Sequence, residues 1–575
     1  MLKLLPIIIT KGEIMSRKWT ILDREKKLEQ YLSDELSIHP VVAHLLIHRG
    51  IKDLESAEKF LLIPNQKSFQ DPFLLKGMEK AINRIRLAKD RRDKVLIFGD
   101  YDVDGVTSSA LLFQLLQKMD IEAEVYLPHR MEEGYGLSKD IVNYAKSNQI
   151  DLLITVDCGI TSVNEVASLN QEAIDVIIVD HHEPSDVLPD AIAIVDPKQK
   201  DCKYPFKYFA AVGLVAKLWQ AMEGKIDENI MDLVAIGTIA DVVPLYGENR
   251  AFVKFGLPII PKTSNTGLQA LLQLTKLDKK VNIRPFHIGF VLGPRINAPG
   301  RMDTARRSLD LFLSKDFGKA EELAKSLEEH NINRQRLQRN IFQEATELID
   351  EEFLKENKII VLSRDGWHKG VLGIVASKVT ERYGRPSIII SVDEDKIGVA
   401  SARSVEGINI YDALTHCSDY LEHYGGHKGA AGLTIKADNI SSFRKAINEF
   451  IEDKVLAADF EDGGPLMIDG HLGLPFLNID LINQIKQLEP FGEGNPEPIF
   501  CSRGLTVTAA PQVLKKETLK FWVSDGRASV SVIGFGMGQY RDKVKMGSKV
   551  DIAYQLSIDD WNKAPTVQLM LKDVQ

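Results

Sequence analysis

The chain has 575 residues, a formal net charge of −9 at pH 7, 44% hydrophobic residues and 27% charged residues. A chain of this length is expected to fold into about three or four globular domains. Its acidic balance argues against a protein that coats nucleic acid with a uniformly basic surface. The net charge does not exclude a local basic groove.

The four cysteines form no CxxC pair, which argues against a disulfide framework or a cysteine zinc site and fits a reducing compartment. Residues 1–19 contain the apolar run LLPIII, which is too short for a signal peptide and has no small-residue cleavage site after it. No apolar run approaches the ~20 residues that span a bilayer. We expect a cytoplasmic protein without membrane contact, in which residues 1–19 are an N-terminal extension and residues 20–74 form short helices.

Residues 75–255 alternate apolar strands with amphipathic helices. The predicted strands are KVLIFGD, EAEVYLP, DLLITVD and DVIIVDHH. Continuous β-branched runs of this kind are typical of strands buried on both faces, which predicts a parallel sheet and hence an α/β domain. In open sheets of this class, ligands bind in the crevice outside the carboxyl ends of the strands.

Acidic side chains stand at those carboxyl ends. The turn DYDVDG places Asp100, Asp102 and Asp104 after the first strand, and Asp157 and Asp180 follow two later strands. Capping of the next helix explains one carboxylate per strand end, but not three in one turn or the two histidines of DHH. Carboxylates this close together repel one another unless a cation lies among them.

These residues predict a site for two divalent metal ions. Carboxylate oxygens with imidazole nitrogens suit Mn²⁺ or Mg²⁺, and Asp241, which follows the apolar segment AIGTIA, is a further candidate ligand. Two ions about 3.5–4 Å apart can activate a water molecule and clamp the attacking and leaving oxygens of a phosphoryl transfer. An EF-hand is disfavoured, because Leu111 occupies the place of its bidentate glutamate.

Three further segments complete the predicted organisation. Residues 256–352 are mainly helical and end in a long charged helix from about residue 315. Residues 353–460, with KIIVLSRDGWHKGVLGIVASKV and RPSIIISV, indicate a second α/β domain. Residues 461–575 change to a period of two, in LTVTAA, LKFWVSD, ASVSVIGF, KVDIAYQLSI and TVQLMLKDV. That pattern predicts a small antiparallel barrel, with an oligonucleotide-binding (OB) fold as a candidate.

The ordered motifs resemble a known family. DYDVDG, TVDCG, DHH and GTIADVVPL look like the four motifs of the DHH phosphoesterase superfamily, and YGGHKGAAG resembles the glycine-rich signature of its associated second domain (DHHA1). The segments LPHRMEEGYGL, GPRINAPGRM, GWHKGVLGIVAS, ASARS and LEPFGEGNPEPIF are similar to those of its bacterial single-strand-specific exonucleases. This resemblance runs from about residue 20 to the end of the chain.

The resemblance implies a DHH domain over residues 75–255 and a DHHA1-type domain over residues 353–460, which face each other across a long helix, with an OB-fold barrel after them. It implies hydrolysis of single-stranded DNA from the 5′ end, with release of 5′-mononucleotides. The implied metal ligands are Asp100, Asp102, Asp104, Asp157, His181 and Asp241. Asp157 would bridge the ions, His182 would assist the phosphoryl transfer as an acid or by stabilising charge, and Asp180 would orient a histidine.

The same resemblance suggests contacts with the substrate. Ser401, Arg403 and Arg130 are candidates for a terminal 5′-phosphate, because arginine forks suit phosphate. Tyr135 could stack on a base. The further phosphate candidates are Arg295, Arg301 and His427. A role in recombinational and mismatch repair, a monomeric state, and partners such as a single-strand-binding protein and a RecQ-type helicase are implied in the same way.

Two alternatives stay open. A DHH phosphodiesterase for short oligonucleotides or cyclic dinucleotides would lack the C-terminal barrel that about 110 strand-like residues predict here. An inert single-strand-binding protein on the same fold would lose metal carboxylates, and all six expected ligands are present. The sequence departs from many superfamily members in one place. LIFGDYD has no histidine before its aspartates, so that Asp100 is expected to take the place of that ligand.

Overall fold

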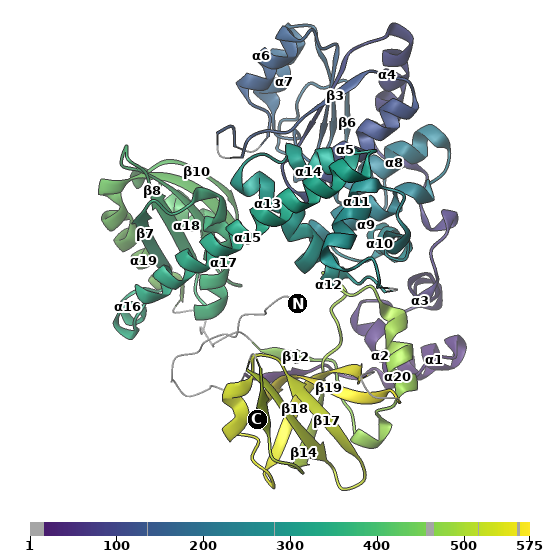
Figure 1. The fold of residues 1–575 in the computed structure, drawn as a ribbon, viewed down its shortest axis with the longest axis vertical. Helices are drawn as coiled ribbons and strands as arrows, with labels where there is room; N and C mark the ends of the chain where they lie inside the picture. Colours follow the sequence, from purple (N-terminus) through teal and green to yellow (C-terminus); the bar gives the residue numbers. More distant parts are fainter. Residues whose placement is uncertain are drawn as a thin grey trace.

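The computed structural model describes residues 17–130, 132–134, 136–280, 282–455, 465–515, 517–559 and 564–575. Figure 1 shows three lobes: an α/β domain, a second α/β domain beside it, and a barrel below both. Within the described residues, no helix combines the length and the apolar character needed to cross a bilayer.

The first lobe is built on a parallel sheet whose strand order is β3-β2-β4-β5-β6. Its strands are β2 (Val95–Gly99), β3 (Ala123–Tyr126), β4 (Leu152–Val156), β5 (Asp175–Val179) and β6 (Ala193–Val195). The four strands predicted from the sequence are confirmed. The short strand β6 was not predicted, although the apolar run AIAIV precedes Asp196 there.

Helices cover both faces of this sheet. They are α4 (Met78–Arg91), α5 (Val103–Lys118), α6 (Lys139–Ser147), α7 (Val163–Gln171), α8 (Ala211–Glu223), α9 (Met231–Ala240) and α10 (Gly247–Gly256). Val95 and Ile97 of β2 pack in the core that contains α5 and α8, whereas Leu96 and Phe98 pack in the core that contains α6 and α7. Alternate residues of β2 therefore lie in two different hydrophobic layers, which explains why every residue of this strand is apolar or small.

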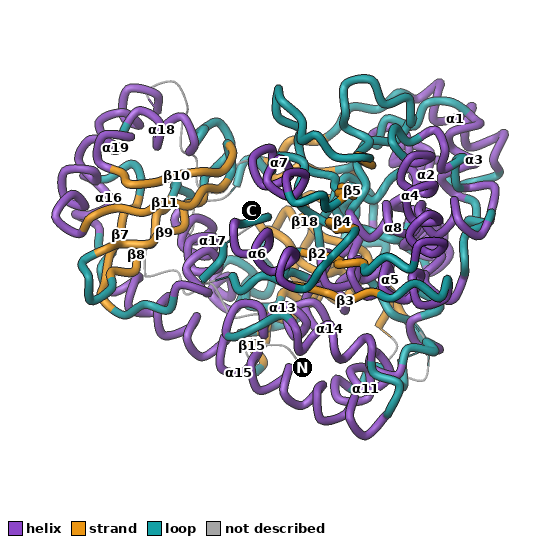
Figure 2. The backbone as a smooth tube through the Cα atoms, turned by 90° about the horizontal axis from the view of Figure 1, so that it is seen from above, coloured by secondary structure: helices purple, strands orange, loops and turns teal. Residues whose placement is uncertain are grey.

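A helical region links the two α/β lobes. It comprises α11 (Thr266–Thr275), α12 (Pro285–His287), the π-helix η5 (Ile288–Leu292), α13 (Gly293–Met302), α14 (Arg306–Leu313) and α15 (Phe317–Glu347). The predicted long helix is confirmed as α15. It begins at the N-cap Asp316, whose carboxylate accepts the N–H of Lys319 at 2.7 Å. Figure 2 shows α15 running from beside α11 to the second lobe. Its 31 residues give the helix a length of about 46 Å.

The second lobe has a mixed sheet of order β10-β11-β9-β8-β7. Its strands are β7 (Ile360–Asp365), β8 (Ser387–Val392), β9 (Ile397–Arg403), β10 (Leu421–His427) and β11 (Ala430–Lys436), and its helices are α16 (Glu351–Glu356), α17 (Leu372–Tyr383), α18 (Ile410–His416) and α19 (Ile440–Val455). The glycine-rich YGGHKGAAG forms the β10–β11 hairpin, in which a Cβ on Gly426 would lie 2.4 Å from the carbonyl oxygen of Ala430.

The C-terminal lobe is a closed barrel. Its main strands are β14 (Phe500–Val507), β16 (Thr518–Ser524), β17 (Ser529–Gly534), β18 (Lys549–Asp559) and β19 (Thr566–Val574). β14 pairs with both β16 and β18, and β17 runs parallel to β19 while the other pairings among these strands are antiparallel. This is the arrangement of an OB fold. Each of the five predicted strands is confirmed, and β15 (Gln512–Leu514) is an additional short edge strand.

The N-terminal helices belong structurally to this barrel. The helices α1 (Lys26–Leu36), α2 (Pro40–His48) and α3 (Leu54–Leu61) follow β1 (Trp19–Ile21), which pairs in parallel with β12 (Leu466–Ile468). Leu45 and Leu46 of α2 lie in one hydrophobic core with Phe521 and Leu569 of the barrel. The sequence predicted helices here but gave no sign of their partner, which lies more than 400 residues away in the chain.

Arg250 ties the barrel lobe to the first α/β domain. This side chain of α10 is buried, and it donates hydrogen bonds to the carbonyl oxygens of Leu488 (2.9 Å), Glu489 (2.8 Å) and Phe60 (3.2 Å). Its guanidinium also lies 3.7 Å from the centre of the Phe60 ring. One cation therefore satisfies backbone acceptors from two distant segments of the chain.

Replacement of Arg250 by methionine should destabilise the protein by about 3 kcal/mol, because several buried carbonyl groups lose their donor. Thermal unfolding should show a fall in Tm of roughly 6–12 °C. Arg336→Met, at an exposed arginine of α15, serves as the control and should stay within about 0.5 kcal/mol of the unchanged protein. Equal Tm values for the two variants would contradict this role of Arg250.

Candidate metal centre

The candidate site lies where three neighbouring strands end. Asp100 follows β2, Asp157 follows β4, and the sequence Asp180–His181–His182 follows β5. Because β2, β4 and β5 are adjacent and parallel, their carboxyl ends meet at one edge of the sheet. The convergence expected from the sequence is therefore present.

The turn DYDVDG is shaped by Asp102 and Gly105. The carboxylate of Asp102 caps α5 by accepting the N–H groups of Asp104 (2.8 Å) and Gly105 (3.1 Å). A Cβ on Gly105 would lie 2.4 Å from the carbonyl oxygen of Asp100, so only glycine permits this close approach. Capping of α5 thus accounts for one oxygen of Asp102 and does not involve Asp100 or Asp104.

Asp104 lies fully buried in the first turn of α5. Its two oxygens accept the N–H groups of Ala211 (2.6 Å) and Val212 (2.9 Å), at the start of α8. The positive end of α8 therefore fixes the carboxylate from behind.

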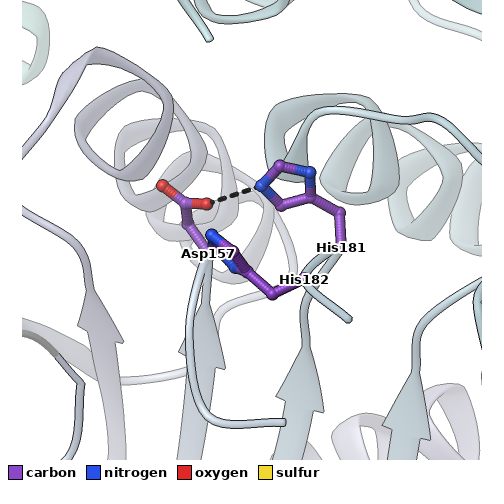
Figure 3. Close-up of side chains that lie close together, drawn as sticks. All are labelled: Asp157, His181 and His182. Atoms are coloured by element: carbon purple, nitrogen blue, oxygen red, sulfur yellow. Dashed lines mark hydrogen bonds and ion pairs between the residues drawn. The ribbon is translucent and has the colours of Figure 1, made fainter. Parts of the chain in front are cut away.

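His181 lies between two carboxylates. Its Nε2 is 3.1 Å from Oδ1 of Asp157 and 3.7 Å from Oδ2 of Asp241, the residue that ends α9. Figure 3 shows the first of these contacts, with His182 beside it. Asp157 has a positive φ of 66°, a conformation that is uncommon outside glycine and that sets its side chain toward the histidine pair.

Asp180 orients His182. The buried carboxylate of Asp180 accepts the N–H groups of Ile160 (2.9 Å) and His181 (2.7 Å), and its Oδ1 is 2.7 Å from Nδ1 of His182. The sequence predicted that Asp180 would orient a histidine. The structure assigns this contact to His182, whereas His181 faces the other carboxylates.

Burial and mutual repulsion dominate the electrostatics of the site. Burial, reinforced by neighbouring carboxylates, raises the pKa of Asp100 to about 8, of Asp104 to about 7 and of Asp241 to about 9. The same causes raise the pKa of Asp157 well above its usual value. Burial and the nearby His182 lower the pKa of His181 to about 3, which keeps its imidazole neutral. Burial alone would raise the pKa of Asp180, but its hydrogen bond to His182 brings it down to about 2.

This donor set fits divalent cations. Ligand atoms gather within 4.8 Å of one another in three overlapping groups: Asp157–His181–His182, Asp104–His181–Asp241 and Asp100–Asp102–Asp157. Oδ1 of Asp100 and Oδ2 of Asp241 are buried without a hydrogen-bond partner among the described residues, as expected for oxygens that face a cation. Asp157 and His181 each belong to two groups, so the site has room for two neighbouring ions that share ligands. All six predicted ligands lie in these groups, and His182 joins them.

Three of the predicted phosphate contacts form a positive cluster. The guanidinium of Arg130 lies 5.0 Å from the centre of the Tyr101 ring, next to Asp100. Burial and the charge of Arg130 lower the pKa of Arg301, to about 10, and of Arg403. Arg403 donates to Oγ of Ser401 at 3.0 Å. Residues of the second lobe therefore reach the edge of the first lobe's sheet that carries the candidate metal ligands (the metal edge).

The other three residues predicted to contact the substrate lie in different surroundings. His427 of β10 and Arg403 of β9 both pair with Ala430 of β11, which places their side chains on the same face of the sheet. Arg295 is engaged with Glu328 of α15, with Nε 2.6 Å from Oε2, so its guanidinium is already neutralised. Tyr135 lies outside the described residues.

Sequence analysis missed two charged residues at the same edge, Asp196 and Lys198, which follow β6. Burial raises the pKa of Asp241, and the positive charge of Lys198 opposes that shift, which places Lys198 close to the candidate ligands. The signal was present in AIAIVDPK, an apolar run that ends in aspartate like the other strand ends.

Comparison with known proteins gives a consistent assignment. Models of the DHH family N-terminal domain, the DHHA1 domain and the RecJ OB domain match residues 94–238, 356–453 and 468–573. The single-stranded-DNA-specific exonuclease RecJ of Bacillus subtilis is 38% identical over 560 residues, covering 97% of this chain and 70% of that protein.

Two crystal structures of RecJ from Thermus thermophilus are similar over 97% of this chain. The complex with Mn²⁺ has a TM-score of 0.82 at 29% identity and 79% coverage of that chain. The complex with Mg²⁺ has a TM-score of 0.76 at 27% identity and 78% coverage.

The raised pKa values of the carboxyl groups predict how the stability of the metal-free protein depends on pH. A carboxyl group whose pKa is raised in the folded protein stabilises the fold at low pH. That stability is lost as the pH climbs from the unfolded value of about 4 through the folded value, here about 7–9. Without metal, the Tm should therefore fall between pH 5 and pH 9. Mn²⁺ at one hundred times its Kd should add about 2.7 kcal/mol to the free energy of unfolding and so raise the Tm again.

Asp241→Asn should reduce both effects, because it removes one buried charge and one ligand. Its Tm in a chelator should fall less between pH 5 and pH 9 than that of the unchanged protein, and Mn²⁺ should raise it less. Asp120→Asn, at a surface carboxylate that is 87% exposed, should behave like the unchanged protein. A full Mn²⁺ response in Asp241→Asn would argue against Asp241 as a ligand.

Proposed function

The chain belongs to the RecJ family of single-stranded-DNA-specific exonucleases, and from this premise we propose that it removes nucleotides from the 5′ end of single-stranded DNA and releases 5′-mononucleotides. The observation that carries this proposal is the position of the positive cluster. Arg130 of the first lobe, Arg301 of the linking helical region and Arg403 of the second lobe lie beside a carboxylate site suited to divalent ions.

The metal edge would bind the scissile phosphodiester. Divalent ions held by Asp100, Asp102, Asp104, Asp157, His181 and Asp241 would supply an activated water and neutralise charge on the phosphate. The chain's own residues hold these ligands in place before substrate arrives. Asp104 is fixed by the N–H groups of Ala211 and Val212, and Asp102 by the turn that it caps.

His182 would assist the phosphoryl transfer as the general acid. Release of a 5′-mononucleotide breaks the bond between phosphorus and the 3′-oxygen of the terminal nucleotide, and that oxygen needs a proton as it leaves. Burial lowers the pKa of His182, but the hydrogen bond and charge of Asp180 outweigh burial and leave the pKa raised. Because Nδ1 contacts Asp180, the other ring nitrogen, Nε2, would carry the transferred proton.

A receptor for the terminal phosphate would set the polarity of cleavage. Arg130, Ser401 and Arg403 offer donors that a doubly charged terminal phosphate can fill and an internal phosphodiester fills less well. Each cycle leaves a new 5′-phosphate on the shortened strand, so the same receptor serves the next cycle. His427, on the same face of the sheet as Arg403, is a further donor for this phosphate.

The barrel would bind more distant nucleotides of the strand. Trp522 is 44% exposed on β16, and Phe535 at the end of β17 is 52% exposed. These strands form the surface on which OB folds stack bases. Such a surface suits a polymer better than a dinucleotide, which favours the exonuclease over a phosphodiesterase for short oligonucleotides. The complete set of buried carboxylates favours it over an inert binding protein.

Within this proposal the enzyme acts as a monomer in the bacterial cytoplasm, in recombination, mismatch repair and other DNA repair. A single-strand-binding protein and a RecQ-type helicase are proposed partners, because both present single strands to such an enzyme.

A labelled single strand tests polarity and the phosphate receptor together. With Mn²⁺ and a strand of about 30 nucleotides, label at the 5′ end should appear at once as mononucleotide, while a 3′-labelled strand shortens gradually. A 5′-phosphate should accelerate cleavage, and Arg403→Gln should lower kcat/KM on the phosphorylated strand about 10- to 100-fold. The same variant should cut the unphosphorylated strand nearly as well as the unchanged protein.

The inactive control is Asp102→Asn, which retains an N-cap for α5 while it removes a carboxylate. Cleavage of di- to tetranucleotides without degradation of the long strand would favour the short-oligonucleotide phosphodiesterase instead. If Arg403→Gln lowered kcat/KM equally on the phosphorylated and the unphosphorylated strand, Arg403 would not be a contact of the terminal phosphate.

Trp522→Ala should raise KM for a strand of about 20 nucleotides about 5- to 100-fold, because one stacked base contributes about 1–3 kcal/mol. The value of kcat and the Tm should change little, since the side chain is 44% exposed. Trp522→Phe should recover most of the affinity. Tyr31→Ala, at an aromatic residue of α1 that is 48% exposed, is the matched control. An unchanged KM in Trp522→Ala would exclude this face from substrate binding.

A further inference from the structure

A basic stripe runs along the junction of α15 and α17. We define it as Arg334 and Arg339 of α15 with Lys378 and Arg382 of α17; the two α15 arginines act on the charge of Lys378, and the two α17 cations lie over the ring of Phe342. The amino group of Lys378 and the guanidinium of Arg382 each lie 5.9 Å from the centre of that ring. A cluster of four cations, two of them over an aromatic ring, contrasts with the net charge of −9 of the whole chain.

Helical spacing aligns most of these residues, and Arg339, on a neighbouring face of α15, is close enough to Lys378 for its charge to act on it. Arg334, Gln338 and Phe342 are at positions i, i+4 and i+8 of α15, and Ile374, Lys378 and Arg382 have the same spacing on α17. The hydrophobic contact between the two helices involves Ile341, Val375 and Val379, with Phe342 packed against it, and none of the four cations belongs to it. The stripe is therefore not required to hold α15 and α17 together.

The four cations lack acidic partners. Over the part of the chain that the structure describes, none of the four lies within 4.0 Å of a carboxylate oxygen, whereas Arg295 and Lys325 near α15 or on it are paired with Glu328 and Glu321. Burial lowers the pKa of Lys378, and the charges of Arg334 and Arg339 lower it further against the opposing effect of Glu381. Uncompensated cations this close together repel one another and favour an anionic ligand.

The stripe continues from the candidate metal centre. A pocket of about 580 Å³ has Val242, Arg301, Arg334 and Ile374 in its wall. Val242 follows the candidate ligand Asp241, and Ile374 lies one helical turn before Lys378. The neighbouring residue Gly373 approaches Arg403, since a Cβ there would lie 2.9 Å from its Nη2. The pocket thus connects the metal edge with the start of the stripe.

We propose that the basic stripe binds the sugar-phosphate backbone of the substrate strand on the 3′ side of the scissile phosphate. This inference rests on the proposed function. From Ile374 to Arg382, α17 extends for about 12 Å, which matches about three stacked nucleotides at ~3.4 Å each. The guanidinium and ammonium groups contact successive phosphates, and Phe342 provides an apolar surface for a sugar or base between them.

The double variant Lys378→Ala/Arg382→Ala tests the stripe through its dependence on strand length. On a 5′-phosphorylated strand of about 20 nucleotides, KM should rise about tenfold with kcat unchanged. The slope of log KM against log salt should shrink by about 1.4, because two phosphate contacts are lost. A 5′-phosphorylated tetranucleotide, which is too short to extend along the whole stripe, should be cleaved within about twofold of the unchanged rate.

Two further variants separate charge from structure. Arg382→Lys should keep most of the affinity for the long strand, because it retains the charge. Lys445→Ala, at a lysine of α19 whose side chain is 81% exposed, should change nothing. Equal losses on both lengths, or no loss on either, would overturn the proposal. If the unchanged protein released no mononucleotide from either strand, the proposed function itself would fail.

Discussion

The repulsion among buried carboxylates at one edge of a parallel sheet is the constraint on which the rest of the structure depends. Burial raises the pKa of Asp100, Asp104, Asp157 and Asp241, so the charged form of the site is unfavourable until cations neutralise it. Backbone N–H groups at the start of α8 and the histidine pair hold these side chains in place despite that cost. The surrounding fold supplies the stability that the site lacks.

Cleavage from one end of a strand needs a second, separately placed group of residues. The first lobe carries the carboxylates, whereas Ser401 and Arg403 stand on a strand of the second lobe. The long helix α15 sets the separation between them, and its buried face packs on α11, α13 and α14 near one end and on α17 near the other. Arg250 fixes the position of the barrel lobe in a similar way, through the carbonyl groups of Leu488 and Glu489. The substrate path proposed here crosses all three lobes, which explains why their relative placement matters for function.

Much of this arrangement could be predicted from the sequence, because its signals are local. Apolar runs that end in aspartate identified β2, β4 and β5, and strand adjacency then brought their aspartates together. The alternating pattern after residue 500 gave the barrel strands. What could not be predicted depends on distant contacts. No local pattern says that α2 packs on the barrel, that Arg295 is neutralised by Glu328, or that Asp180 contacts the imidazole of His182 rather than that of His181. The strand β6 was overlooked although AIAIVDPK carries the same local signal as the other strand ends, and Asp196 and Lys198 were missed with it.

The most direct test is to count and locate the ions. Electron paramagnetic resonance of the protein titrated with Mn²⁺ reports both the number bound and whether two ions are close enough to couple magnetically. Two coupled Mn²⁺ ions per chain, reduced to one weakly bound ion or none when Asp157 is replaced by asparagine, are the predicted result. Binding of a single uncoupled ion, or an unchanged spectrum in Asp157→Asn, would contradict a shared site built from the ends of β2, β4 and β5.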